Sequence, residues 1–245
     1  MGGRPGAMTA ATPALGSCLV CGSPGPRLFC HVDGRTYWRC DACAATLLDP
    51  TMHPSPEAER AEYRLHRNNP HDPGYRRFVS RLGDPLLARL EGPRRGLDFG
   101  SGGGSALAAI FEESGHEVVP YDPFFADDPG ALSERYDFIL CSEVVEHFHD
   151  PAREFRRLDG LLEPGAWLGI MTCFQTDDEK FAGWHYRKDL THVVFYREET
   201  LRFIANEHGW TCEIPRKDVA LMRKPDRRPW RASARRSARQ RRVSR

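Results

Sequence analysis

The stretch Gly96–Gly104, GLDFGSGGG, joins a short apolar strand to a run of glycines, and the helical pattern of Leu107, Ile110 and Phe111 follows directly. Glycines at such a junction permit positive φ angles and let the backbone approach a ligand closely. The free N–H groups at the start of a helix attract negative charge. The sequence therefore predicts that this turn binds a nucleotide-like cofactor.

The chain around this turn alternates between strand and helix patterns. Strands are predicted at 96–99, 117–121, 138–141 and 167–172, with helices beginning near Gly103, Asp150 and Arg197. Such alternation predicts an α/β fold, with a parallel sheet covered by helices on both faces. The pattern changes at 210–214 and 219–222, where a terminal antiparallel hairpin is predicted.

Composition and length limit the class of protein. The chain has 245 residues, of which 40% are hydrophobic and 28% charged, which is typical of a soluble globular protein and excludes a fibrous one. No apolar run approaches the roughly 20 residues of a membrane span. Residues 1–17 have no apolar segment of the kind found in a signal peptide, so a flexible leader and a cytoplasmic protein with no membrane contact are expected.

The net charge of +1 conceals a strongly basic C-terminus. Residues 223–245 contain eleven Lys or Arg and one acid, so this tail carries +10 and the rest of the chain −9. Blocks of like charge favour disorder, and a disordered tail is predicted over residues 224–245. The tail is a candidate contact for polyanions such as RNA, or a solubilising segment without a partner.

Four cysteines form two pairs, Cys18–Cys21 and Cys40–Cys43, with eighteen residues between the pairs. This spacing is typical of a zinc ribbon in which four thiolates hold structural Zn²⁺. A hairpin over 27–39 that turns at Asp33 and Gly34 is expected to join the pairs, within a ribbon over 18–48. Two disulfides are the alternative, which a reducing compartment disfavours.

Residues 49–92 are predicted to form a helical linker that covers the cofactor. A helix is expected to begin at Asp72-Pro73, to break at Gly83–Pro85 and to resume beyond it. The candidate lid residues are Tyr63, His66, Asn68 and Tyr75. The alternative is that these four side chains belong to the core or the surface and have no such role.

The spacing of the glycines argues against a dinucleotide fingerprint. In G-x-G-x-x-G the third glycine would fall at position 105, which is Ser105, whereas here Gly100, Gly102 and Gly104 alternate after Asp98. Asp122 follows the second predicted strand, eighteen residues past Gly104. A carboxylate at that place can accept two hydrogen bonds from a ribose diol.

With these motifs the chain resembles the class I S-adenosylmethionine-dependent methyltransferases. The resemblance covers 86–222 and rests on LDFGSGGG, YDPFF, YDFILCSEVVEHFHDP and LLEPGAWLGIMT. It implies a Rossmann-like sheet of seven strands, the last antiparallel. It also implies that Gly100, Gly102 and Gly104 approach the methionine moiety, that Asp98 lies near the amino group and that Asp122 holds the ribose hydroxyls. Only fourteen residues separate Asp122 from Asp137, so the third strand and its helix are expected to be abbreviated.

A cluster of ionisable residues follows the strand at 138–141. Glu143, Glu146 and His147 stand at i, i+3 and i+4, which predicts that all three lie on one face of a helical turn. Two carboxylates and an imidazole can bind a divalent cation such as Mg²⁺, Mn²⁺ or Zn²⁺ and so activate a hydroxyl.

The ExxEH spacing resembles two groups of metal-using methyltransferases, the quinone O-methyltransferases of ubiquinone synthesis and the 2′-O-methyltransferases of small-RNA 3′ ends. The second group brings a further histidine from beyond the fifth strand, to which His192 corresponds. The candidate catalytic residues are therefore Glu143, Glu146, His147 and His192. Two alternatives stay open: His147 or His192 acts as a base without metal, or none of these residues takes part.

The segment 181–189, FAGWHYRKD, mixes aromatic and titratable residues and follows the predicted strand at 167–172. A packed core would carry fewer titratable groups, so this segment is a candidate acceptor wall. The residues expected to face the acceptor are Trp184, His185, Tyr186 and His192, with simple packing as the alternative.

These patterns predict a methyltransferase over 93–223 that transfers a methyl group to oxygen or nitrogen. A small-molecule acceptor is slightly favoured over RNA, because no aromatic and basic stacking platform is evident in the body of the chain. The alternatives are a non-enzymatic RNA- or protein-binding module of the same fold, built on the ribbon and tail, and a nicotinamide dehydrogenase.

Overall fold

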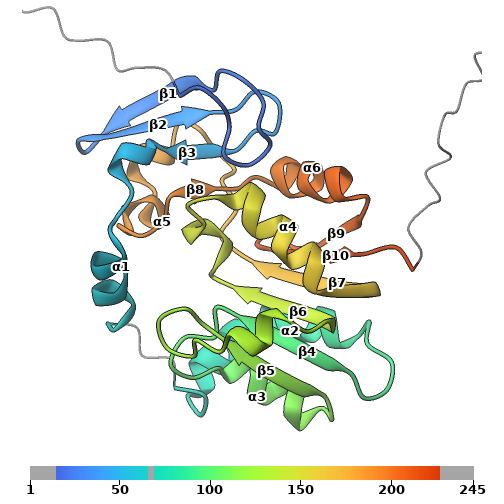
Figure 1. Cartoon of the computed structure of the whole chain (residues 1–245). Helices are drawn as coiled ribbons and strands as arrows, with labels where there is room; N and C mark the ends of the chain where they lie inside the picture. The colour runs from blue at the N-terminus through green and yellow to red at the C-terminus, as the bar shows by residue number, and fades with distance from the viewer. Residues whose placement is uncertain (1–14, 66–68, 227–245) are drawn as a thin grey trace, which may run out of the picture.

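The structure of the chain is a computed structural model, which describes residues 15–65 and 69–226 (Figure 1). Predictions for 1–14, for the lid candidates His66 and Asn68, and for the basic tail over 227–245 lie outside the described residues. Among the described residues no helix is long and apolar enough to cross a membrane.

The main sheet has six strands in the order β5-β4-β6-β7-β10-β9. Its strands are β4 (Arg95–Phe99), β5 (Glu117–Tyr121), β6 (Tyr136–Ser142), β7 (Leu162–Met171), β9 (Thr211–Arg216) and β10 (Val219–Arg223). The first four are parallel, whereas β10 runs antiparallel to both β7 and β9. The predicted parallel sheet and terminal hairpin are therefore confirmed.

The prediction of seven strands is wrong for the described residues. The segment between β5 and β6 forms only an isolated bridge between Asp122 and Ala126 and the short 3-10 helix η2 (Pro129–Leu132). A parallel strand needs a crossover of a dozen or more residues, and the segment that would supply both strand and crossover is barely that long. β5 is therefore the edge of the sheet.

Helices cover both faces of the sheet, which gives three layers. One face packs on α2 (Pro73–Leu87) and α3 (Ala106–Glu113), and the other packs on α4 (Pro151–Leu161) and α6 (Glu198–His208). Alternate residues of β6 divide between these layers: Phe138 and Leu140 face α2 and α3, while Ile139 and Cys141 face α4.

The helix α2 continues through the segment where a break was expected. Pro85 lies in its last turn, and Val79, Leu82 and Leu86 are fully buried on one face against the sheet. Pro85 removes one backbone hydrogen bond near the helix end, where its cost is small compared with the burial of these three side chains.

The N-terminal cysteine unit builds a second, smaller sheet at the top of Figure 1, in the order β1-β2-β3-β8. Its strands are β1 (Arg27–Val32), β2 (Arg35–Arg39), β3 (Thr46–Leu48) and β8 (Val194–Phe195). The predicted hairpin is present as β1 and β2. The fourth strand comes from the segment after β7, so both sheets share one hydrophobic core.

The remaining elements are short and lie in the connections. They are η1 (Pro50–Met52), α1 (Pro56–Tyr63), η3 (Val145–His147), η4 (Phe181–Gly183) and α5 (His185–Lys188). The helix α1 stands apart from the main sheet in Figure 1, on the way from the small sheet to α2.

Candidate functional site

A cavity of about 990 Å³ opens at the carboxyl ends of β4, β5 and β6. In open parallel sheets ligands bind at this edge. Its walls include the glycine turn, the residues after β5, the segment after β6 and parts of α1, α2 and α5; among them are Tyr63, Tyr75, Asp98, Gly100, Gly102, Gly103, Asp122, Glu143, His147, His149, His185, Tyr186 and His192. Of the predicted glycines, Gly104 is the one that does not line this cavity.

The backbone conformation after β4 requires a glycine at position 100. Its φ is +85°, and a Cβ there would lie 2.5 Å from Cγ2 of Val144. Gly102 also has a positive φ, of +62°. Ser105 then caps α3, because its hydroxyl accepts a hydrogen bond from the N–H of Ala108 at 2.9 Å.

Asp98 is the penultimate residue of β4, before this turn, and is only 3% exposed. Its Oδ2 has no hydrogen-bond partner among the described residues. Burial raises the pKa of Asp98 to about 6, and the charge of Asp122 adds to this rise while a hydrogen bond with Ser105 opposes it. A buried carboxylate oxygen without a partner on a cavity wall is suited to a cationic ligand group.

Asp122 connects the two loops of the site through hydrogen bonds. Its Oδ2 accepts a hydrogen bond from the N–H of Gly102 at 2.9 Å, and its Oδ1 accepts from Phe124 at 2.8 Å and Phe125 at 3.1 Å. A carboxylate has about four acceptor positions, so Oδ2 keeps one for a ligand hydroxyl.

The expected helical turn over the ExxEH motif is wrong. Glu143 has a φ of +55°, and only Val145–His147 form a 3-10 turn, so Glu143 does not share a helical face with Glu146 and His147. Strained backbone of this kind is concentrated at functional sites. Glu143 still lines the cavity, and burial, followed by the nearby charge of Glu146, raises its pKa to about 8.

The structure instead brings Glu146 and His147 together with His192. One side-chain ligand atom from each of these residues lies within 4.8 Å of the others. The two imidazole rings have their centroids 4.7 Å apart. His192 comes from the segment before β8, so this group unites two of the three ExxEH residues with the more distant predicted histidine.

Backbone carbonyls orient both histidines. Nδ1 of His147 lies 3.0 Å from the carbonyl oxygen of Thr191, and Nδ1 of His192 lies 2.7 Å from that of Tyr186. Because a carbonyl only accepts, each Nδ1 carries the proton and each Nε2 keeps its lone pair. This is the arrangement of a metal-ligating histidine. Burial lowers the pKa of His192, which favours the neutral ring.

Glu146 is fully buried, and its two oxygens differ. Oε1 accepts a hydrogen bond from the hydroxyl of Tyr186, which also contacts Thr172 at 3.0 Å. Oε2 has no partner within the described part of the chain. Burial raises the pKa of Glu146. A buried carboxylate oxygen beside two imidazole rings suits a divalent cation.

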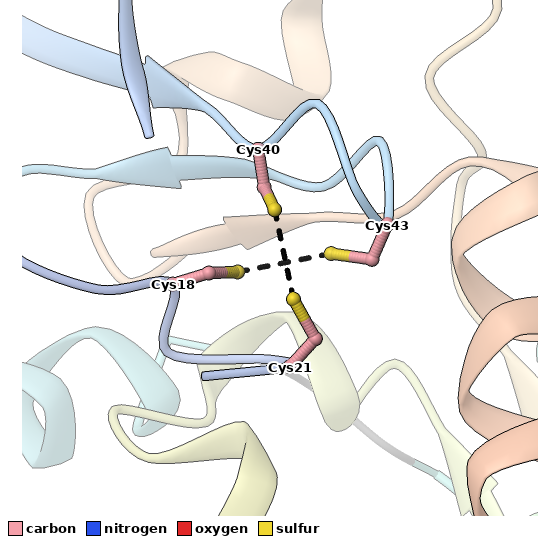
Figure 2. A group of neighbouring side chains, drawn as sticks. All are labelled: Cys18, Cys21, Cys40 and Cys43. Carbon is pink, nitrogen blue, oxygen red and sulfur yellow. Dashed lines mark hydrogen bonds between the residues drawn. The ribbon is translucent and has the colours of Figure 1, made fainter. Parts of the chain in front are cut away.

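The four paired cysteines converge in the ribbon, as Figure 2 shows. Sγ of Cys18 lies 3.7 Å from that of Cys43, and Sγ of Cys21 lies 3.6 Å from that of Cys40. A tetrahedral zinc with bonds of about 2.3 Å requires sulfur separations of about 3.8 Å. All four are free thiols, so the two-disulfide alternative is not supported.

Some of the residues predicted to face the acceptor line the cavity, and one does not. His185 and Tyr186 line the cavity, as do the lid candidates Tyr63 and Tyr75, whereas Trp184 packs against Phe181 and Phe195 away from it. Trp184 therefore belongs to an aromatic cluster beneath the ribbon.

The sequence patterns missed Glu59 and His149, which form a pair at 2.9 Å on the cavity wall. They are ninety residues apart, and no local motif connects them.

Comparisons with known proteins identify the type of domain. A family described as a methyltransferase domain matches residues 67–213. A ubiquinone biosynthesis O-methyltransferase of Bordetella pertussis is 35% identical over 57 residues, 23% of this chain and 22% of that protein. One of Cereibacter sphaeroides is 30% identical over 95 residues, 39% of this chain and 34% of that protein. The chain thus spans about a fifth to a third of these relatives.

Similar solved structures include human N-acetylserotonin methyltransferase, with a TM-score of 0.48 and 15% identity over 70% of this chain and 60% of that one. Another is a Burkholderia thailandensis 1,6-didemethyltoxoflavin-N1-methyltransferase, with a TM-score of 0.44 and 20% identity over 82% of this chain and 99% of that one. The family match extends over more than half of the sequence, and the chain therefore belongs to the methyltransferase-domain family.

Proposed function

We propose that this protein is an S-adenosylmethionine-dependent methyltransferase that acts on an oxygen or nitrogen of its acceptor. The observation that carries the proposal is Asp98, whose buried and unpartnered Oδ2 lies on the cavity wall under the glycine turn. The ammonium group of the cofactor is the cation that this oxygen would receive. When bound, S-adenosylmethionine supplies a methyl group on a positively charged sulfur.

The residues around Asp98 have separate tasks in this proposal. Gly100 and Gly102 allow the backbone to approach the methionine moiety closely, because neither carries a Cβ. Asp122 accepts a hydrogen bond from the ribose hydroxyls while it holds the glycine turn. The aromatic rings of Tyr63 and Tyr75 help to exclude water from the cavity.

Binding of S-adenosylhomocysteine tests the cofactor assignment. Asp98→Ala is expected to weaken binding at least about tenfold in isothermal titration, because a charged hydrogen bond is lost. Asp127→Ala, which removes an exposed carboxylate on the same loop region as Asp122, is the matched control and should bind normally. Absence of binding by the unmodified protein, or preference for NAD in a thermal shift assay, would overturn the proposal.

We further propose that Glu146, His147 and His192 hold a divalent cation beside the acceptor. Support comes from the proximity of their ligand atoms, the carbonyl-oriented imidazoles and the unpartnered Oε2 of Glu146. When bound, such an ion lowers the pKa of an acceptor hydroxyl. Glu143 lines the same cavity, and its ionised carboxylate is the group that would take up the proton of the acceptor.

Titration with Mn²⁺, Mg²⁺ and Zn²⁺ tests this cation site. Glu146→Gln and His192→Asn are each expected to abolish the Mn²⁺ binding, whereas the exposed His71→Asn should leave it intact. Equal Mn²⁺ binding by all these proteins would exclude the cation site. Methyl transfer that is unaffected by chelators would then favour His147 or His192 as a base without metal.

The four cysteines are proposed to hold structural zinc in a ribbon over 18–48, with the methyltransferase domain over 93–223. The proximity of the four sulfur atoms, which lie within 4.8 Å of one another, supports this assignment. A small-molecule acceptor is favoured, because the candidate reaction centre lies inside a cavity and not on an open surface. Deleting 227–245 and measuring the salt dependence of RNA binding tests RNA as the rival acceptor.

A further inference from the structure

Val193, the residue before strand β8, connects the ribbon to the candidate cation site. The N–H of Leu48 in β3 donates to the carbonyl of Val193 at 2.8 Å, and the N–H of Val193 donates to the carbonyl of Glu146 at 2.9 Å. Val193 directly follows His192. One residue is therefore hydrogen-bonded to the ribbon through its carbonyl and to the turn of Glu146 through its amide.

A second connection runs through Arg187, the largest fully buried side chain of the described structure, which is 1% exposed. Its guanidinium donates to Oδ2 of Asp33 at 2.5 Å and lies 3.4 Å from the hydroxyl of Tyr37. Both partners belong to the ribbon hairpin, with Asp33 at its tip. It also donates to the carbonyl of Ala182 at 2.8 Å. Ribbon groups thus hold α5 through a buried charge.

The residue next to Arg187 contacts two members of the candidate cation group. The hydroxyl of Tyr186 donates to Oε1 of Glu146, and its carbonyl accepts from Nδ1 of His192. A shift of α5 would therefore disturb both the carboxylate and the tautomer of the histidine. The third member, His147, has its Nδ1 3.0 Å from the carbonyl oxygen of Thr191.

We propose that the ribbon positions Glu146 and His192, and that Asp33 and Arg187 are positioning residues for the candidate reaction centre. The inference rests on the proposed function, which assigns Glu146 and His192 their role. In this arrangement the ribbon forms part of the support of the site. Its loss would loosen the acceptor side of the cavity and spare the cofactor side, which is built on β4 and β5.

The variant Asp33→Gly tests this proposal without touching a cysteine. Asp33 has a φ of +50°, which glycine adopts without strain, and its side chain is 67% exposed, so the substitution removes little beyond the partner of Arg187. The matched control is Arg27→Ala at the start of β1 in the same hairpin, which breaks the exposed pair with Asp41. Exposed ion pairs contribute little to stability.

Two structural measurements on the full chain, together with the affinity for S-adenosylhomocysteine, are compared between these variants. The first is hydrogen–deuterium exchange of 185–196 and of 96–99. The second is the nitrogen NMR spectrum of His192, which distinguishes an Nδ1–H ring from an Nε2–H ring. In Asp33→Gly, exchange over 185–196 is expected to rise at least about fivefold and the Nδ1–H signature to weaken, while 96–99 and S-adenosylhomocysteine affinity stay unchanged. Arg27→Ala should change none of these.

Unchanged exchange and an unchanged His192 signature in Asp33→Gly would overturn the proposal. So would an equal loss of protection over 96–99, because the ribbon would then stabilise the whole fold without selectivity. A second variant, Cys40→Ser, opens the ribbon at its cysteine group and should give the same selective pattern. These readouts need neither methyl transfer nor a bound cation. An intact protein that fails to bind S-adenosylhomocysteine would refute the proposed function and leave the positioning test decisive.

Discussion

The hydroxyl of Tyr186, a residue on the wall of the cavity, lies 2.5 Å from Oε1 of Glu146, which is fully buried. This contact leaves Oε2 of the same carboxylate as the oxygen without a partner in the described structure. The hydrogen bond from Tyr186 therefore determines which oxygen of Glu146 is available to a cation. Tyr186 lies forty positions after Glu146 in the chain.

Removing this hydroxyl should weaken the cation site without dismantling it. Tyr186→Phe is expected to reduce Mn²⁺ affinity and the rate of methyl transfer by about 10- to 100-fold, as is usual when an outer partner of a ligand is lost. Tyr136→Phe is the matched control, because its buried hydroxyl donates to the carbonyl of Ala131 away from the site. Normal Mn²⁺ affinity in Tyr186→Phe would contradict the role of this hydrogen bond.

Asp98→Asn should have opposite effects on stability and on binding. The pKa of Asp98 is raised from its ordinary 3.8 to about 6, so this group favours the folded state most below pH 3.8. That contribution is lost as the pH rises through about 6. Above pH 7 the asparagine variant is therefore expected to be more stable by up to about 3 kcal/mol, as measured by chemical denaturation without ligand.

The same substitution should remove the pH dependence of cofactor binding. Affinity of the unmodified protein for S-adenosylhomocysteine is expected to fall as the pH decreases below about 6, where Asp98 gains a proton. Asp98→Asn should bind weakly at every pH. Titration calorimetry between pH 5 and 7.5 in a common buffer mixture measures the affinity of both proteins, with Asp127→Ala as the reference. An equal pH dependence of affinity in the unmodified protein and in Asp98→Asn would refute the role of Asp98 in cofactor binding.

Gly100→Ala should disrupt the turn of the cofactor site. The added Cβ would meet Val144 at 2.5 Å, in a backbone conformation with φ of +85° that alanine disfavours. A loss of roughly 1–3 kcal/mol in unfolding free energy is expected, together with loss of S-adenosylhomocysteine binding. Gly160→Ala in α4, where a Cβ meets nothing within 4 Å, should instead stabilise the protein by about 0.5–1 kcal/mol. If Gly100→Ala changed neither the unfolding free energy nor the binding of S-adenosylhomocysteine, the predicted clash with Val144 would be contradicted.

Cys40→Ser should release zinc and lower the melting temperature. One zinc per chain is expected in the unmodified protein, and a site with three thiolates should lose it to a chelator. Cys212→Ser is the matched control, since Cys212 is half-buried in β9 and belongs to no cysteine group. Elemental analysis with thermal denaturation measures both effects. Equal zinc content in the two variants would contradict the assignment.

Local sequence patterns predicted the parts of this fold that depend on short-range geometry. The strand at Gly96–Phe99, the glycine turn and the hairpin at Asp33 follow from backbone sterics over a few residues. The cysteine spacing predicted that the thiols of each pair lie close together, because each pair lies within one tight turn. The terminal antiparallel hairpin followed from its own alternation of residues.

Other features depended on packing between distant segments. The helical turn expected for the ExxEH motif gave way to a strained Glu143 and a 3-10 turn. The N–H of Glu143 bonds to the carbonyl of Met171 in β7, and Val193 bonds to the carbonyl of Glu146. These contacts come from other strands, so no helical periodicity could anticipate them.

The sequence by itself determined the methyltransferase type of sheet, the cysteine group and the acidic residues at the ends of β4 and β5. Only the tertiary structure decided that the sheet has six strands, that the ribbon shares a strand with the later chain and that His192 joins Glu146 and His147. The physical reason is range. Backbone sterics and periodicity act between neighbours along the chain, whereas strand pairing and a buried arginine bring together residues more than a hundred positions apart.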